Sequence, residues 1–139
     1  MSDISFDRAR RYVLGLGCER GTPSAEVLAL AGEALRAAGI GGAELAAIAS
    51  IDSRGQEAAI VDIAAHFSVP AVFFDAPRLE EETPRLKNPS AIVFARVGCH
   101  GVAESAALAA IGADAELVIG KMKSAHATAA IARIGLQKA

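Results

Sequence analysis

The chain has 139 residues, which suits one domain with a proper hydrophobic core. Its net charge of -2 and its aromatic content of 4 % argue against nucleic-acid binding, because neither a basic surface nor a base-stacking platform is available. Apolar residues make up 53 % of the chain, but no uninterrupted apolar run reaches the roughly 18–20 residues that a membrane span needs.

Residues 1–11 are polar, and we interpret them as a leader to the first strand. They lack a basic segment followed by an apolar one, so no signal peptide is expected. Two cysteines, Cys18 and Cys99, are too few for a disulfide framework and suit a reducing compartment. The sequence therefore predicts a cytoplasmic protein without a membrane partner.

A glycine turn at residues 15–23 connects an apolar strand, about 12–17, to a helix that runs to about residue 38. Thr22 is expected to cap this helix, and Gly39 is expected to end it. The first amides of such a helix are unpaired and can receive an anion.

The next strand is predicted at residues 45–51, and polar residues follow it abruptly. Ser53 and Gln56 have the spacing of a capping box for a second helix. A third strand is predicted at residues 71–74, after Pro70. Residues 76–89 are rich in proline and glutamate, which predicts an exposed connection with at most a turn of helix.

The last third of the chain predicts a fourth strand at 91–97, a second glycine turn, and a helix at 102–111. Two further strands, 117–119 and 128–134, flank a basic loop, so they are expected to pair as an antiparallel hairpin. Continuous apolar strands alternating with helices define the fold class as α/β: a single three-layer α/β domain over residues 1–139, with a mostly parallel sheet and a C-terminal antiparallel hairpin. Ligands of such folds bind at the carboxyl ends of the strands.

The glycine turn does not match the nucleotide fingerprints. Arg20 stands where a dinucleotide-binding loop has its third glycine, and no P-loop lysine is present. Either the turn only permits close packing, or it binds another anion, a function that Arg20 favours. Cys18 lies just before a helix, so it is a conceivable nucleophile with His100 as base. The stronger interpretation is that cysteine is small and apolar enough to end a buried strand. No metal-ligand spacing is recognised among the cysteines and histidines.

Three cationic residues, Arg20, Arg54 and Lys121, follow three different predicted strands, so we expect them to converge at one sheet edge. Acidic residues intermingle with them: Asp52, Glu57 and Glu104. Solvated loops and helix-dipole acids would also explain these charges. A sheet edge that carries both cations and carboxylates suits a ligand with several carboxylates, or acid–base catalysis on such a ligand.

Four segments together give a resemblance to a known family: Gly-Leu-Gly-Cys-Glu-Arg-Gly-Thr at 15–22, Ser-Ile-Asp-Ser-Arg-Gly-Gln-Glu at 50–57, Val-Ala-Glu-Ser-Ala-Ala-Leu at 102–108, and Lys121 followed by Thr-Ala-Ala-Ile-Ala-Arg at 128–133. In that order, over nearly the whole chain, they resemble the family formed by CobE and the C-terminal domain of CbiG, proteins of cobalamin biosynthesis.

The resemblance implies a precorrin-type tetrapyrrole as ligand and other corrin-pathway enzymes as partners. No cofactor and no metal site are expected. It leaves open a carrier, a hydrolase that opens a precorrin lactone with release of acetaldehyde, and a generic polyanion-binding domain. For a hydrolase, Asp52 or Glu57 would activate water. The implied ligand-binding residues are Gly15, Gly17, Cys18, Arg20, Gly21, Thr22, Ser50, Arg54, Gly98, Glu104, Lys121 and Thr128.

Overall fold

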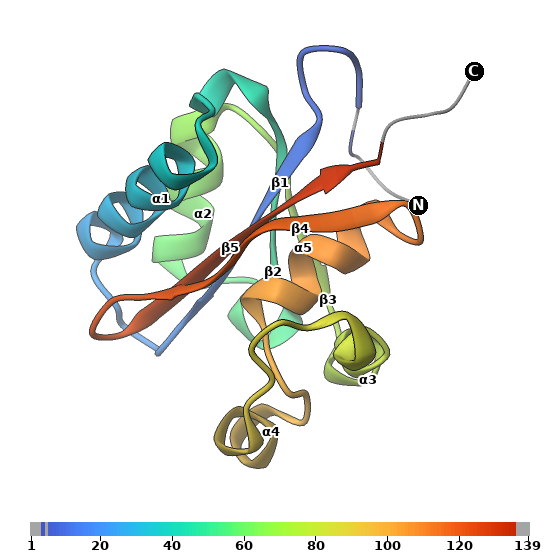
Figure 1. The fold of residues 1–139 in the computed structure, drawn as a ribbon. Helices are drawn as coiled ribbons and strands as arrows, with labels where there is room; N and C mark the ends of the chain where they lie inside the picture. Colours follow the sequence, from blue (N-terminus) through green and yellow to red (C-terminus); the bar gives the residue numbers. More distant parts are fainter. Residues whose placement is uncertain (1–3, 5, 136–139) are drawn as a thin grey trace.

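A computed structural model describes residue 4 and residues 6–135, so part of the expected leader, residues 1–3 and 5, lies outside the described residues. The centre of the fold is a five-stranded sheet of order β3-β2-β1-β5-β4 (Figure 1). The first three strands are parallel, whereas β5 runs antiparallel to both β1 and β4. The strands are β1 (Tyr12–Cys18), β2 (Leu45–Ile51), β3 (Ala71–Phe74), β4 (Ala115–Lys123) and β5 (Ala127–Ile134). The predicted fold class is confirmed.

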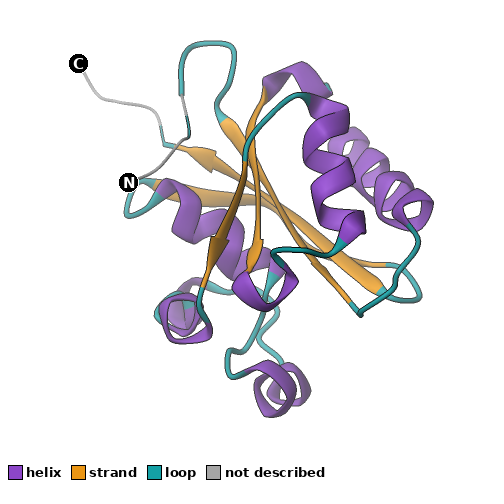
Figure 2. Cartoon of the chain, turned by 180° about the vertical axis from the view of Figure 1, so that it is seen from behind, coloured by secondary structure: helices purple, strands orange, loops and turns teal. Residues whose placement is uncertain are grey.

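Helices cover both faces of the sheet (Figure 2). Helices α1 (Ser24–Ala38) and α2 (Ala58–Phe67) share one core with Leu14 and Leu16 of β1. Helices α3 (Ala76–Glu80) and α5 (Ala103–Ile111) share the other core with Val13. Neighbouring residues of β1 point to opposite faces, so this central strand is apolar along its length.

Gly15 allows α5 to lie against β1. A Cβ atom at this position would lie 1.9 Å from the carbonyl oxygen of Ala103. The first glycine of the 15–23 turn is therefore required for packing of helix on strand, as one of the two interpretations of this turn predicted.

The strand predicted at residues 91–97 is wrong, because these residues form helix α4 (Ala91–Val97). Both ends of α4 carry helix-terminating features. The Ser90 hydroxyl accepts a hydrogen bond from the Val93 amide at 3.2 Å, and Gly98 adopts the left-handed conformation (φ 87°). No residue of α4 is buried, and Ile92 and Phe94 are exposed. A short apolar run alone does not distinguish a strand from a helix.

Three local predictions about caps and loops are also wrong. Thr22 does not cap α1; its hydroxyl donates to the Glu19 carbonyl at 2.6 Å. Ser53 does not cap α2, because Asp52–Arg54 forms a 3₁₀ turn (η2) and Glu57 takes the N-cap position. The predicted basic loop is shorter than expected, since Lys121 and Lys123 belong to β4. The remaining 3₁₀ turns are η1 (Gly42–Glu44) and η3 (Thr83–Arg85). No helix in the described part of the chain is long and apolar enough to cross a membrane.

Candidate functional site

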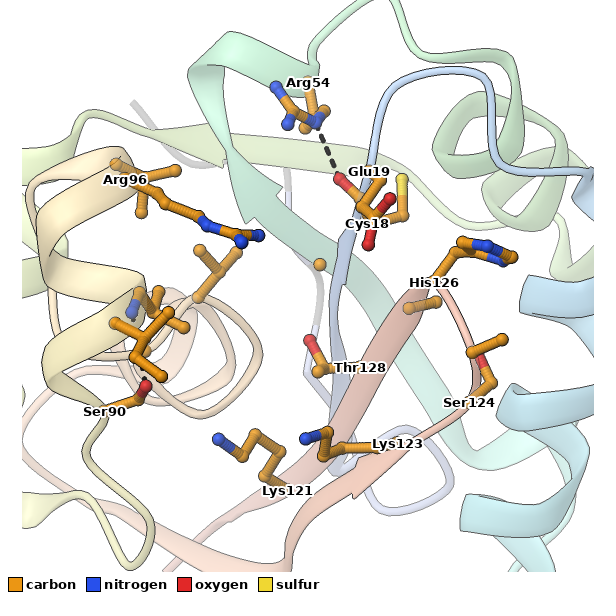
Figure 3. A pocket seen from close by; sticks show the side chains of 18 residues that line it. Cys18, Glu19, Arg54, Ser90, Arg96, Lys121, Lys123, Ser124, His126 and Thr128 are labelled. Atoms are coloured by element: carbon orange, nitrogen blue, oxygen red, sulfur yellow. Dashed lines mark hydrogen bonds between the residues drawn. The ribbon is translucent and has the colours of Figure 1, made fainter.

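A cavity of about 360 Å³ opens at the carboxyl end of β1 (Figure 3). One wall consists of the end of β1 and the tip of the β4–β5 hairpin, and the other wall consists of α4. We call these the sheet wall and the helical wall. Such a volume lies in the range of small-molecule sites, and the location matches the strand edge where α/β folds bind ligands.

The sheet wall is fixed by strand pairing. Cys18 pairs with Ala127 and Gly17 with Thr128, so the hairpin tip lies directly beside the end of β1. A Cβ atom on Gly17 would lie 2.8 Å from the Thr128 hydroxyl oxygen. Glycine at position 17 therefore allows β1 and β5 to pair closely at this end. The pairing of β4 with β5 in turn places Lys121 and Lys123 at the cavity (Figure 3).

Two arginines complete a cationic rim. Arg54, from η2, donates through Nε to the Cys18 carbonyl at 2.7 Å, which anchors its guanidinium at the end of β1. Arg96 extends from α4 into the cavity (Figure 3). Of the described residues that line the cavity, Glu19 supplies the one carboxylate against Arg54, Arg96, Lys121 and Lys123. The site is therefore positive in charge and suited to an anionic ligand.

The hairpin tip is held by Glu26 of α1. This carboxylate accepts hydrogen bonds from the Ser124 hydroxyl at 2.5 Å and the His126 amide at 2.7 Å. The His126 Nδ1 atom lies 3.0 Å from the other carboxylate oxygen. Hydrogen bonds from Ser124 and His126 lower the pKa of Glu26 to about 2, and the same contact raises the pKa of His126. A protonated His126 adds a further cation to the mouth of the cavity.

Apart from Arg96, the helical wall presents apolar side chains to the cavity. Ile92, Val93 and Val97 of α4 line the cavity. The ring of Phe94 stacks on His100 with centroids 4.5 Å apart, and His100 Nδ1 lies 2.9 Å from Glu80. These contacts outside the cavity connect α4 to α3, and they leave an apolar surface that faces the cationic sheet wall.

The structure brings five predicted site residues together at this cavity: Gly17, Cys18, Arg54, Lys121 and Thr128. Arg20 and Asp52 are exposed and do not line it. Arg54 and Lys121 thus line one cavity at the expected sheet edge, whereas Arg20 lies outside it.

Other predicted site residues act within the protein. The Gly21 amide donates to Glu57 Oε2 at 2.8 Å, so an internal carboxylate already occupies this amide of the glycine turn. The buried Ser50 hydroxyl donates to the Leu16 carbonyl at 2.6 Å and ties β2 to β1. Thr22 is buried, Gly98 ends α4, and Glu104 is buried and does not line the cavity.

The cysteines do not form a reactive centre. Burial raises the pKa of the Cys18 thiol, which disfavours the thiolate. The His100 ring contacts Glu80 rather than Cys18. Within the described residues, no three His, Cys, Asp or Glu side chains come close enough to hold a metal ion.

Sequence reasoning missed the helical wall. Ile92, Val93 and Arg96 were assigned to a buried strand, so they were not expected at a site. The signals that could have located them are Ser90 and Gly98, a capping residue and a helix-terminating glycine at the two ends of the run.

Fold and cavity define a three-layer α/β domain with a cation-lined, ligand-sized site at the carboxyl edge of its sheet. Residues 12–132 match the family described as "Cobalamin synthesis G C-terminus". The chain is 58 % identical to Protein CobE of Sinorhizobium sp over 120 residues, which cover 86 % of this chain and 78 % of that protein. It therefore belongs to the CobE and CbiG C-terminal family of cobalamin biosynthesis, as the resemblance predicted.

Solved structures agree with this assignment. The crystal structure of CobE, from the cobalamin biosynthetic pathway, superposes with a TM-score of 0.83 at 35 % identity and covers 88 % of this chain and 93 % of that one. A cobalamin biosynthesis protein chiG from Agrobacterium tumefaciens gives a TM-score of 0.62 at 30 % identity, covering 88 % and 97 %. The chain is also 30 % identical to the cobalt-precorrin-5A hydrolase of Priestia megaterium, of whose length it spans 33 % while the match covers 91 % of this chain.

Proposed function

We propose that the protein binds a precorrin-type tetrapyrrole in the cavity between the sheet wall and the helical wall. The observation that carries this proposal is the composition of the cavity lining: apolar side chains on α4 lie opposite Lys121 and Lys123, and Arg54 and Arg96 add two further cations. A precorrin has a largely apolar macrocycle with acetate and propionate groups at its rim. The macrocycle would contact Ile92 and Val93, and the carboxylates would bind the cations.

The names of the relatives support this ligand class. CobE belongs to the cobalamin pathway, and the Priestia megaterium protein is named for its action on cobalt-precorrin-5A. A domain that binds such an intermediate without transforming it would carry it and present it to other enzymes of the pathway.

An absorbance titration with a precorrin intermediate tests the proposal. Arg54→Ala and Lys121→Ala are each expected to weaken binding about tenfold, since each removes a charge-assisted hydrogen bond. Arg36→Ala, on the exposed side of α1, is the matched control and should bind as the wild type does. If the wild type gives no spectral change, or if all three variants bind equally, the proposal fails.

Opening of a precorrin lactone with release of acetaldehyde is the second candidate, favoured by the similarity to the hydrolase. For this reaction, Asp52 and Glu57 remain the predicted catalytic residues. Neither lines the cavity, and Glu57 already accepts the Gly21 amide hydrogen bond. Acetaldehyde that forms with the wild type and is lost in Glu57→Gln would support the hydrolase over the carrier.

A further inference from the structure

Glu104 is a buried carboxylate whose hydrogen-bond partners lie in β4 and in the segment that precedes α4. It extends from the first turn of α5 and is 2 % exposed. Its Oε1 atom accepts hydrogen bonds from the amides of Lys87 and Asn88, both at 3.0 Å. Its Oε2 atom accepts from the Asn88 side-chain nitrogen and from the Lys121 amide, both at 2.8 Å.

The partners of Glu104 belong to two separate segments of the chain. Lys121 lies in β4 where the pairing with β5 shifts register between Ile119 and Met122. At this irregularity a Cβ atom on Gly120 would lie 3.2 Å from Glu104 Oε2, so the strand backbone approaches the carboxylate closely. Lys87 and Asn88 precede Ser90, the cap of α4. One side chain therefore connects the strand that carries Lys121 to the segment that leads into α4.

The charge of Glu104 is stabilised by dipoles. Burial alone would raise the pKa of Glu104, but hydrogen bonds from Asn88, Lys121 and Lys87 outweigh it and lower the pKa. The group is therefore ionised at neutral pH, and an ionised carboxylate can accept all four hydrogen bonds.

Glu82 offers a matched comparison, because it is also buried, at 6 % exposed. Its oxygens accept from Arg78 at 2.7 Å and from Arg85 at 2.8 Å, within the connection between β3 and α4. Neither Glu82 nor its arginine partners line the cavity. If Glu104 only stabilised the fold, Glu104→Gln and Glu82→Gln should lower ligand affinity to the same extent.

We propose that Glu104 is a positioning residue that sets the place of Lys121 relative to the helical wall, and so tunes the cavity for a carboxylate of its ligand. This inference rests on the proposed function and extends it to a residue that does not touch the ligand. Without the anchor, the irregular part of β4 can relax into regular pairing, and the Lys121 amino group would then leave the cavity edge.

The first arm of the test needs no ligand. Hydrogen exchange is compared in the wild type, Glu104→Gln and Glu82→Gln. The glutamine side chain replaces one acceptor oxygen by a donor, so at least one of the Lys87, Asn88 and Lys121 amides should exchange about tenfold faster in Glu104→Gln and not in Glu82→Gln. Unchanged protection at all three amides would overturn the proposal. If Glu104→Gln does not fold, Glu104→Asp keeps the charge, shortens the side chain and takes its place.

The second arm measures affinity for uroporphyrin III, a stable tetrapyrrole with acetate and propionate groups at its rim. Glu104→Gln is expected to lower affinity about tenfold in the wild-type background and about twofold in a Lys121→Ala background, because its effect acts through Lys121. An equal loss in both backgrounds, or an equal loss in Glu82→Gln, would overturn the positioning role. If the wild type binds neither uroporphyrin III nor a precorrin, the proposed function fails, while the exchange arm still decides whether Glu104 anchors both segments.

Discussion

The two walls of the cavity differ in how they are held. The sheet wall is paired along its length, and Val13, Leu14 and Leu16 of β1 are fully buried. The helical wall has no buried residue, and Ile92 is 69 % exposed. A rigid wall that carries cations faces a lightly anchored wall that carries apolar surface. Substitutions in the buried part of β1 should therefore lower stability, whereas substitutions of exposed residues in the helical wall should change binding with little effect on stability.

Gly15→Ala should produce the largest effect, because its Cβ atom would meet the Ala103 carbonyl oxygen at 1.9 Å. The clash would push α5 away from β1, and we expect a loss of at least about 3 kcal/mol in the free energy of unfolding. Denaturant titration measures it. Gly41→Ala, where no atom lies within 4 Å of the added carbon, should stay within about 0.5 kcal/mol of the wild type. Equal losses in the two variants would show that the sheet wall is not closely packed at Gly15.

Ile92→Ser should weaken tetrapyrrole binding about fivefold, since a partly exposed side chain would be covered by the macrocycle on binding. The free energy of unfolding should change by less than about 0.5 kcal/mol. Val61→Ser on α2 removes another exposed apolar side chain, 45 % exposed and away from the cavity, and serves as control. If Ile92→Ser lowers the free energy of unfolding but leaves the affinity unchanged, the helical wall acts in stability and not in binding, which would contradict the comparison.

The smallest effect concerns pH at the hairpin tip. The pKa of Glu26 is lowered to about 2 from 4.5, so its contribution to stability is full above about pH 4.5 and is lost as the pH falls toward 2. The pKa of His126 is raised above 6.5, so its contribution is full below pH 6.5 and is lost as the pH rises through the raised value. The contact between Glu26 and His126 should therefore stabilise the protein most between about pH 4.5 and 6.5.

NMR titration of the Glu26 carboxyl carbon measures this effect directly. The midpoint should lie near 2 in the wild type. It should move upward in Ser124→Ala, which removes the hydrogen bond that lowers the Glu26 pKa most. A midpoint near 4.5 in both proteins would mean that Glu26 does not hold the hairpin tip.

The sheet wall could be predicted from sequence because its signals are local and redundant. The apolar runs of β1 and β2 are long enough to be recognised, and Gly39 ends α1 in the left-handed conformation (φ 72°), as predicted. The hairpin followed from two strands separated by a short loop. The place of Arg54 and Lys121 at one edge then followed from the topology.

The helical wall could not be predicted in the same way. The run Ala91–Val97 is apolar yet unburied, so the usual link between hydrophobicity and a core strand fails there. The role of Glu57 could not be predicted for another reason. Its hydrogen bond with the Gly21 amide joins residues 36 positions apart, and no local sequence pattern indicates such a contact. The three residues that donate four hydrogen bonds to Glu104 likewise come from two distant segments.

Chemical-shift mapping of the protein with a bound precorrin-type tetrapyrrole tests the central claim most directly. Amide signals of Gly17, Lys121 and Thr128 on the sheet wall and of Val93 on the helical wall should shift and saturate with one dissociation constant. Signals around Val61 on α2 should not move. Shifts confined to the exposed turn at Arg20 and Gly21, or an absence of shifts on α4, would contradict a ligand held between the two walls.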